Sequence, residues 1–438
     1  MLRVTLIRKF PKIDLSEKEL GTLEDFVSWR RVPVFPRRGR LAWHLFGDPP
    51  KRRDDPSVQY QAAKIKGVGV YNPPEGLRGR DPVFKETLTE PRPPTTEPLS
   101  SFVTYPHLGF ASDTSFMAAY GDVAPVGGIT VDKALREYEA AEHLYAAGVP
   151  SIAPMLVFNY DDPALVFQGK QLGAVICGVP DSQPYRISEV QFGAGLGNSE
   201  GDQSEVYYRR LLSSFEIEGD PFAEVTRLTL LGQIARQVGE RIAQFSRAGL
   251  YRYSAELPNF DFDFVRGQVL LTDLDSCDFL SELDHSFQRL QIMRDFASAV
   301  YHLIAKFATP RALGHYTVRA LLENDPIPHL LDGYFGSDYA QDWTASSRKL
   351  WNCFLPHFEL LSKYRNDIWD AWSQERRRTY KMDHHLFYVL VMSEFAEHFS
   401  RRTSSFPGTD MPEHRIDAMA QIFLERRYDY FRYLRFPY

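Results

Sequence analysis

The chain has 438 residues, of which 44% are hydrophobic and 25% are charged. This composition is typical of a globular protein and excludes disordered, collagen-like and coiled-coil chains. The 51 lysines and arginines against 57 aspartates and glutamates give a net charge of -6, which argues against general nucleic-acid binding through the overall field. No run approaches the roughly 18 to 20 apolar residues of a membrane span, and the first residues lack a signal-peptide pattern. We therefore expect a cytoplasmic protein that makes no membrane contact.

Three cysteines, Cys177, Cys277 and Cys353, are far apart in the sequence. Their odd number and wide spacing fit neither a disulfide framework nor a thiolate zinc site, so we expect reduced thiols in or near the core. The 12 histidines include no HExxH pair, and the adjacent His384 and His385 point to different sides of any helix that they share. A metal site built from two histidines is therefore not predicted.

The first half of the chain has short apolar runs separated by proline and glycine, which is typical of strands joined by turns. Strands are predicted within residues 29–45 and over residues 62–71, the second ending at glycines. The segment 72–99 contains PPEG, RDP, EPRPP and EP, which predicts a loop insertion. Residues 130–148 have apolar side chains at helical spacing and end at a glycine shortly before a proline, which predicts a helix.

Beyond this helix the pattern changes from strands to long amphipathic helices. IAPMLVFNY and ALVFQGKQLGAVICGV predict a strand hairpin, and QVLLTD at 268–273 predicts a further strand. Helical spacing of apolar residues predicts helices over 224–248, 285–310 and 344–401. Strand-rich sequence followed by helix-rich sequence predicts an α+β protein with two lobes.

Two charged residues of the first half are placed as a nucleotide-phosphate site requires. Phosphoryl and nucleotidyl transfer need a cation on the phosphates, a carboxylate that fixes this cation, and oxygen ligands for Mg²⁺. Lys66 follows an apolar strand segment, and Glu137 lies in the first half of the next predicted helix. The pair predicts a sheet lysine held by a helix glutamate. Taken singly, a lysine beside glycines is more often a solvated turn residue, and a helix glutamate is more often a surface charge.

A metal site is predicted in the segment GLYRYSAELPNFDFDFVRGQVLLTDLDS. Asn259 lies in a loop, and Asp273 follows at the end of an apolar strand. A loop asparagine with an acidic residue at the tip of the next strand is how kinase-like folds hold Mg²⁺, and Asp275, Asp261 and Asp263 add further oxygen ligands. The alternatives are an Asx turn after the strand and, for Asp261 and Asp263, the solvent-exposed face of a strand.

The sequence indicates the catalytic base less clearly than it indicates the metal ligands. A protein kinase carries its catalytic aspartate five residues before the metal-binding asparagine, and this chain has Ser254 there. Neither G-x-G-x-x-G nor G-x-x-x-x-G-K-[ST] is present, so an ordinary protein kinase is not predicted. Glu256, three residues before Asn259, is the nearest carboxylate that could act as a base, and the alternative is a solvated loop residue.

These motifs together resemble the selenoprotein O family of kinase-like protein adenylyltransferases. The resemblance is carried by KIKGVG (64–69), LREYEAAEHLYAAGVPS (135–151), GAVICGV (173–179), LPNF and TDLDS. It implies that Lys66 contacts the nucleotide phosphates, that Arg136 and Glu137 support it from the helix, and that Asn259 and Asp273 hold the metal. It also implies an inverted ATP from which AMP is transferred.

The same resemblance extends, with departures, to further residues. Arg186 matches, after a one-residue shift, the second of two phosphate-contacting arginines of the family, and Gly178 stands where the first would be. Gly121-Asp122 resembles part of a Gly-Asp-Gly-Arg motif, which implies that Asp122 lies at the nucleotide. The family has its catalytic aspartate immediately before the metal-binding asparagine, whereas this chain has Pro258, and the family's C-terminal cysteine or selenocysteine has no counterpart. The resemblance therefore predicts the fold and the nucleotide site better than the reaction.

We therefore expect an α+β, bilobal, protein-kinase-like fold. Its small sheet-rich N-lobe is predicted over 1–180 with a long insertion at about 72–129. Its helical C-lobe is predicted over 181–438, with a metal-binding loop at about 251–278 and a C-terminal helical extension.

The function predicted from this site is that of a transferase that uses ATP with Mg²⁺ or Mn²⁺. It would move AMP or a phosphoryl group to a hydroxyl on a protein or a small molecule. The alternative is a catalytically inactive pseudokinase scaffold that binds nucleotide and partner proteins. The absence of an aspartate at both familiar base positions favours the scaffold, whereas the retention of the lysine, the glutamate and the metal ligands together favours activity.

Overall fold

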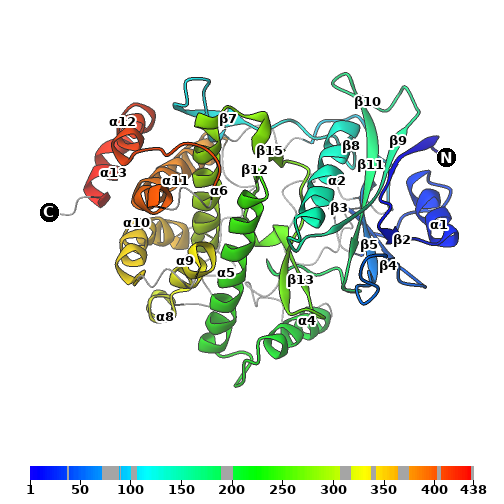
Figure 1. The fold of residues 1–438 in the computed structure, drawn as a ribbon, viewed down its shortest axis with the longest axis horizontal. Helices are drawn as coiled ribbons and strands as arrows, with labels where there is room; N and C mark the ends of the chain where they lie inside the picture. The colour runs from blue at the N-terminus through cyan, green and yellow to red at the C-terminus, as the bar shows by residue number, and fades with distance from the viewer. Residues whose placement is uncertain are drawn as a thin grey trace. The chain divides into compact units, whose positions relative to one another are not determined.

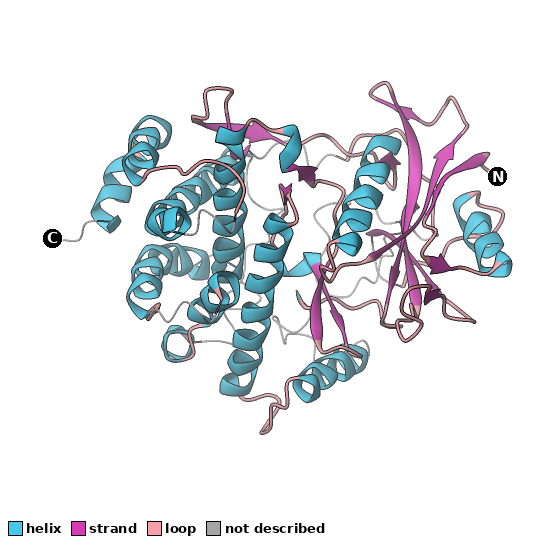
Figure 2. Ribbon diagram, in the orientation of Figure 1, coloured by secondary structure: helices cyan, strands magenta, loops and turns pink. Residues whose placement is uncertain are grey.

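The computed structural model describes residues 1–36, 39–71, 88, 90–99, 106–188, 201–305, 317–336, 342–363, 374–401 and 406–435. The chain forms two compact units. The sheet unit consists of residues 1–103, 122–185 and 262–277, and the helical unit consists of residues 104–121, 186–261 and 278–438. Strands dominate the first and helices the second (Figure 2). The predicted α+β class is therefore confirmed.

A seven-stranded antiparallel sheet is the core of the sheet unit (Figure 1). Its main path runs through β1 (Val4–Lys9), β9 (Ala153–Tyr160), β11 (Lys170–Val179), β5 (Ala62–Tyr71) and β3 (Gly39–Leu45), and the short β8 (Ile129–Thr130) and β10 (Val166–Phe167) also pair with β11. A separate small pair joins β2 (Ile13–Asp14) and β4 (Lys51–Arg52). The pairing of β9 with β11 confirms the predicted hairpin.

β5 is nearly all buried, as expected of a strand with neighbours on both sides. Its predicted bounds are confirmed, but it continues through its two glycines instead of ending at them. Gly67 and Gly69 have φ angles of 88° and 122°. A Cβ at Gly67 would overlap the carbonyl oxygen of Gly173 in β11, so only glycine lets the two backbones approach this closely.

The strands predicted within residues 29–45 are only partly present. β3 begins at Gly39, and residues 29–36 form no strand. Pro33 and Pro36 interrupt that segment, and proline has no N–H to donate to a sheet partner. The apolar pattern alone therefore overpredicted the strand.

Two helices accompany the sheet, α1 (Glu17–Val27) and α2 (Val131–Ala146), and they lie on opposite sides of it in Figure 1. α2 packs on β9 and β11. Its apolar residues recur at helical spacing, and Gly148 follows the helix with a φ of 70°, a left-handed conformation that commonly ends helices. The helix predicted over 130–148 is confirmed.

A strand pair late in the sequence belongs mostly to the sheet unit, which takes in residues 262–277, while residues 260–261 are assigned to the helical unit. It consists of β13 (Phe260–Asp263) and β14 (Gln268–Leu271). Asp261 and Asp263 are 6% and 2% exposed, so the alternative of a solvent-exposed strand face is wrong. Asp263 instead accepts hydrogen bonds from the backbone N–H groups of Val265 and Arg266 at 2.9 and 3.1 Å, so its carboxylate closes the turn between the two strands.

The helical unit holds most of the remaining secondary structure (Figure 1). Its helices are α4 (Gly201–Ser214), α5 (Glu224–Arg247), α6 (His285–Ala305), α8 (Val318–Glu323), α9 (Pro326–Phe335), α10 (Thr344–Lys363), α11 (Gln374–Arg401), α12 (Glu413–Leu424) and α13 (Arg427–Arg435). Two single-turn helices, η1 (Leu257–Asn259) and η2 (Leu280–Glu282), and the short pair β12 (Leu250–Tyr251) and β15 (Asp278–Phe279) also belong to it. The helices predicted at 224–248 and 285–310 are found as α5 and α6, and those predicted within 344–401 are found as α10 and α11, while residues 306–310 and 364–373 lie outside the described residues.

A hairpin lies within the insertion predicted at about 72–129, beyond the segment 72–99 that was predicted to be a loop. β6 (Pro106–Phe110) pairs with β7 (Phe116–Tyr120), and the hairpin belongs to the helical unit. It contacts α11 and α12, with the rings of Phe116 and Phe423 5.9 Å apart. Of the segment 72–99, most lies outside the described residues, and residues 90–99 form bends and isolated bridges.

The three cysteines are buried and form no disulfide, as expected. Among the described residues, no helix has both the length and the apolar character needed to cross a membrane.

Candidate functional site

Lys66 of β5 is the centre of a charged cluster in the sheet unit. Its Nζ lies 2.6 Å from Oε2 of Glu137 and 3.6 Å from Oδ2 of Asp275, and it donates a hydrogen bond to Oδ1 of Asp273. The side chains of Lys66 and Glu137 are 16% and 2% exposed, whereas those of Asp273 and Asp275 are 34% and 27% exposed. The cluster therefore has a buried end on α2 and an accessible end on the segment after β14. The structure thus brings four residues predicted from the sequence to one place.

Backbone pairing explains why residues so far apart in sequence meet. Lys66 lies opposite Val175 of β11 in the sheet, and α2, which carries Glu137, packs on β11. Leu271, at the end of β14, donates to the carbonyl of Pro150 and accepts from the N–H of Ile152 at 3.1 and 2.9 Å. These two bonds hold β14 next to the start of β9, so the residues that follow it reach Lys66.

A second contact, missed from the sequence, fixes the same segment. Lys64 is 6% exposed, and its Nζ donates a hydrogen bond of 3.3 Å to Oγ1 of Thr272. Lys64 and Lys66 lie on the same face of β5 because side chains alternate along a strand. The signal in the sequence is the spacing of two between lysines inside an otherwise apolar strand.

Asp273 has an unusual backbone conformation. Its φ is 64°, in the left-handed region that non-glycine residues rarely adopt. Such a conformation costs on the order of 1 kcal/mol or more, and in proteins it concentrates at functional sites. The strained backbone presents the carboxylate to Lys66.

The cluster carries an excess of negative charge, because one ammonium faces three carboxylates. Burial raises the pKa of Glu137 to about 7; Lys66 opposes this shift, and Asp275 and Asp273 add to it. Burial acts to lower the pKa of Lys66, but the surrounding carboxylates hold that pKa well above its usual value. Lys66 therefore stays protonated, and Glu137 takes up a proton more readily than an ordinary glutamate does.

The residues present fit a divalent cation. Mg²⁺ is usually bound through one or two carboxylates together with substrate phosphates and waters, and Asp273 and Asp275 supply two carboxylates on one accessible segment. The uncompensated negative charge there favours a cation. Within the described residues, no group of three or more histidine, cysteine, aspartate or glutamate side chains could hold a metal alone, so ligands from the nucleotide would have to complete the coordination shell.

Asn259, the other predicted metal ligand, lies in the helical unit at the end of η1. Its Nδ2 donates a hydrogen bond of 2.8 Å to the carbonyl of Ser254, and the hydroxyl of Tyr253 donates to the Asn259 carbonyl. With its amide nitrogen held in this way, Oδ1 is the atom that a cation would use.

A buried aspartate, also missed from the sequence, holds the loop that leads to Asn259. Asp295 of α6 is fully buried, and its Oδ2 accepts a hydrogen bond of 3.2 Å from the backbone N–H of Tyr253. Burial raises the pKa of Asp295, and the guanidinium of Arg294, 2.9 Å away, opposes the shift. Arg252, just before Tyr253, has a φ of 66°, which is a strained backbone conformation. The hydrogen bond from Tyr253 to Asp295 of α6 holds the loop in this conformation.

The remaining predicted site residues are dispersed. Arg136 is half-buried on α2, next to Glu137, and Arg186 is half-buried at the start of a segment of the helical unit. Asp122 is 75% exposed and forms an ion pair of 3.9 Å with Lys133, which is a surface pair and not part of the Lys66 cluster. Glu256, in the loop held by Asp295, forms an ion pair of 3.6 Å with Nδ1 of His302.

No protein-family model matches the chain, and no curated protein matches its sequence. Among solved structures, WaaP in complex with acyl carrier protein matches at 13% identity and a TM-score of 0.28, over 61% of this chain and 90% of WaaP. The amicoumacin kinase hAmiN in complex with AMP-PNP, Ca²⁺ and Ami matches at 13% identity and a TM-score of 0.27, over 66% and 91% of the two chains. Glucosamine kinase with glucosamine, ADP and inorganic phosphate matches at 11% identity and a TM-score of 0.20, over 86% and 94%. These similarities are distant, so the function of this chain has to be argued from its own residues.

Proposed function

We propose that this protein is a transferase that uses ATP with Mg²⁺ or Mn²⁺ and moves a phosphoryl group or AMP to a hydroxyl acceptor. The observation that carries the proposal is the contact of Lys66 with a buried helix carboxylate and with the strained Asp273. A strand lysine, a helix glutamate and a metal-binding aspartate are the parts that kinase-like enzymes use to hold ATP. Retention of all three in one cluster supports nucleotide binding.

The roles follow from the charges and the exposure of each residue. Lys66 would bind the phosphates, and Glu137, buried behind it, would hold the ammonium in place. Asp273 and Asp275 would bind the metal, which neutralises phosphate charge when it is present. Asn259 as a further ligand remains a proposal from the sequence.

Arg136, Arg186 and Asp122 are kept as proposed nucleotide contacts on the strength of the resemblance to the selenoprotein O family alone. Asp122 has the weakest support of the three because it is exposed and paired with Lys133. Transfer of AMP, which needs an inverted ATP, rests on the same resemblance. Transfer of the γ-phosphoryl group needs the ordinary orientation of ATP.

Catalysis in this proposal depends on positioning and on the stabilisation of charge, which dominate phosphoryl transfer. The acceptor oxygen forms a bond to phosphorus while the bond from that phosphorus to the leaving ADP or pyrophosphate oxygen breaks. The acceptor proton passes to a base, for which Glu256 is the proposed residue.

The test is transfer of label from ATP. Purified protein and cell extract are incubated with Mg²⁺ or Mn²⁺ and with ATP labelled at either the α or the γ phosphate. Transfer of α label indicates AMP transfer, and transfer of γ label alone indicates a kinase. We expect Lys66→Ala and Asp273→Asn each to lower transfer at least 100-fold. Lys170→Ala is the matched control because Lys170 is a surface lysine, 57% exposed and paired with Asp132, and it should leave transfer unchanged.

The competing proposal is a pseudokinase scaffold, favoured by Ser254 and Pro258 at the two familiar base positions. Both proposals expect Mg²⁺-dependent stabilisation by ATP, since a ligand at 100 times its dissociation constant adds about 2.7 kcal/mol to the free energy of unfolding. A thermal shift without transfer of either label identifies the scaffold. Neither a shift nor transfer rejects both proposals.

A further inference from the structure

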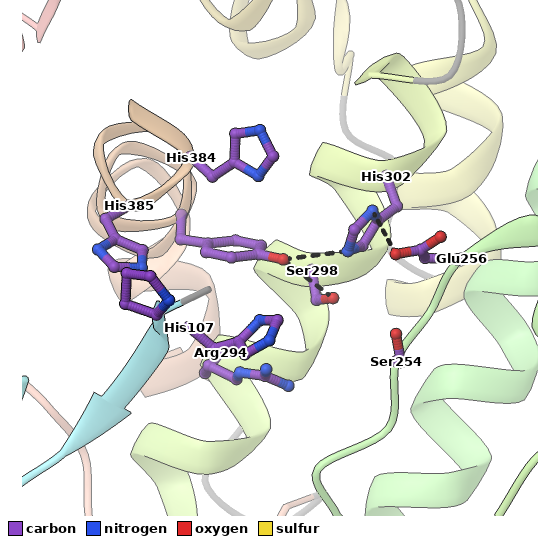
Figure 3. Close-up of a pocket in the computed structure, with 10 residues that line it drawn as sticks. His107, Ser254, Glu256, Arg294, Ser298, His302, His384 and His385 are labelled. Atoms are coloured by element: carbon purple, nitrogen blue, oxygen red, sulfur yellow. Dashed lines mark hydrogen bonds and ion pairs between the residues drawn. The ribbon is translucent and has the colours of Figure 1, made fainter. Parts of the chain in front are cut away.

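A polar cavity lies within the helical unit beside the loop that carries Glu256 (Figure 3). Ten residues line it, from β6, the 254–256 loop, α6 and α11, and nine of the ten have polar side chains, Pro106 being the exception. Its volume is about 40 Å³, enough for a few waters and therefore for one hydroxylated arm of a ligand. A cavity lined almost wholly by hydrogen-bonding groups would be costly to cover with an apolar molecule.

A relay of side chains connects α11 to Glu256 across this cavity. The hydroxyl of Tyr388 lies 3.1 Å from Nε2 of His302 and 3.4 Å from Oγ of Ser298, and Nδ1 of His302 lies 3.6 Å from Oε1 of Glu256 (Figure 3). The imidazole therefore stands between the tyrosine and the glutamate. Nδ1 lies within ion-pair distance of the carboxylate, so a hydrogen on Nδ1 would attract the carboxylate and favour one position for it.

Three of the residues that line the cavity lie on one face of α6. Arg294, Ser298 and His302 are spaced by four residues on α6, which puts them on one face of the helix. Arg294 is paired with Asp295, which also binds the backbone of the loop leading to Ser254 and Glu256. The loop and the cavity wall are thus held by neighbouring residues of one helix. The side chains that line the cavity are therefore held in defined positions by hydrogen bonds and ion pairs.

We propose that this cavity binds the hydroxyl-bearing arm of a small polyhydroxylated acceptor, with Glu256 as its base and His302 as the residue that positions Glu256. This inference rests on the proposed function and names the acceptor class for it. Carboxylate, guanidinium, imidazole and hydroxyl groups line the cavity, and a molecule with several hydroxyls can both donate to them and accept from them. So narrow a polar cavity suits a small molecule better than a peptide segment, which favours a small molecule over a protein as the acceptor.

The chemical step balances without a further reactant. The acceptor hydroxyl donates its hydrogen bond to the Glu256 carboxylate. Its oxygen forms the bond to a phosphorus of ATP, the bond to the leaving ADP or pyrophosphate oxygen breaks, and the acceptor proton ends on Glu256. His302 remains unchanged and acts only by holding the carboxylate.

The first arm of the test identifies the acceptor class. Cell extract is separated by ultrafiltration into a small-molecule filtrate and a protein retentate, and each is incubated with the full-length protein, Mg²⁺ and labelled ATP. We expect labelled product in the filtrate. Label in the retentate alone overturns the proposed acceptor class. Absence of label in both fractions overturns the proposed function and this inference together.

The second arm tests the two residues with filtrate as the acceptor. We expect Glu256→Gln to lower kcat about 100-fold and His302→Ala to lower it about tenfold, both with an unchanged KM for ATP. His302→Asn, whose amide can replace the Nδ1 donor, should recover most of the activity. His285→Ala, an exposed histidine on the same helix, is the control and should match the wild type.

The outcomes separate the inference from the function on which it rests. If the wild type labels the filtrate and Glu256→Gln does so equally well, the inference fails while the proposed function stands. If His302→Asn is as impaired as His302→Ala although both melt at the wild-type temperature, His302 does not act by donating to Glu256. A rise in the KM for ATP in either variant would also count against a role limited to the acceptor.

Discussion

At the scale of single residues, the Lys66 cluster shows how burial and charge set the protonation state of a site. Three carboxylates face one ammonium, and the most deeply buried of them, Glu137, has the raised pKa. Asp273 and Asp275 are more exposed and lie on the accessible side. A cation on these two aspartates would relieve the repulsion that the folded protein otherwise bears. In the proposed function, a bound cation would therefore stabilise the cluster.

The raised pKa of Glu137 predicts a pH dependence of stability. In the range between the ordinary value of 4.5 and about 7, the folded protein holds a proton on Glu137 that the unfolded chain has released. The stabilisation is therefore fully present below about pH 4.5 and is lost as the pH rises through about 7, with a total on the order of 3 kcal/mol. Urea unfolding between pH 5 and 8 should show the wild type losing this free energy, whereas Glu137→Gln should not.

Glu142→Gln is the matched control for this experiment, because Glu142 is exposed on the same helix. It should keep the wild-type pH dependence. If the free energy of unfolding changes with pH in the same way in Glu137→Gln and in the wild type, Glu137 ionises in the folded protein as readily as in the unfolded chain. Burial then does not raise its pKa.

At the scale of elements, the helix crossing between α5 and α9 depends on two glycines. A Cβ on Gly239 would overlap the carbonyl of Leu330 and lie 2.8 Å from the backbone nitrogen of Tyr334, and a Cβ on Gly333 would overlap the carbonyl of Arg236. The two backbones therefore approach more closely than any larger residue allows. Gly21, in the middle of α1, has no atom within 4 Å of such a Cβ.

The same substitution should have opposite effects at these two helix positions. Gly239→Ala should force the helices apart and lower the free energy of unfolding by about 2 kcal/mol or more. Gly21→Ala should raise it by about 0.5 to 1 kcal/mol, because alanine loses less backbone entropy in a helix. Guanidinium unfolding of both variants measures the difference. A neutral effect at Gly239 would show that the crossing has room to relax.

The sequence predicts elements with a strong local pattern and misses those fixed by distant partners. The repeat in α2 and the apolar run of β5 are local, and their predicted bounds agree with the structure. The hairpin β6–β7 was missed because its stability comes from α11 and α12, some 300 residues later in the chain. Within the Lys66 cluster, Lys66 and Glu137 could be predicted from the sequence because each follows from the pattern of one element. Outside this cluster, the positions of Asp295 and His302 could not be predicted, because their partners lie on a loop that has no periodic pattern.

At the scale of the whole molecule, the sheet unit is assembled from segments far apart in the chain. Residues 262–277 are added to it after much of the helical unit has intervened. They supply the backbone bonds of Leu271 to Pro150 and Ile152 and the side chains of Thr272 and Asp273. The division predicted at residue 180 remains a prediction, and a fragment experiment tests it.

A fragment of residues 1–185 should fold poorly, because it leaves Lys64, Lys66 and the Pro150–Ile152 backbone without the partners that the later segment supplies. Buried polar groups that lose their partners cost about 1 to 3 kcal/mol each. Joining residues 260–278 to this fragment through a flexible Gly/Ser linker should restore cooperative unfolding, at a cost in loop entropy that grows only slowly with linker length. Near-ultraviolet circular dichroism during urea titration compares the two fragments, which share every other residue. Equal cooperative transitions would mean that the first 185 residues suffice for the sheet unit, and that residues 262–277 do not contribute to its folding.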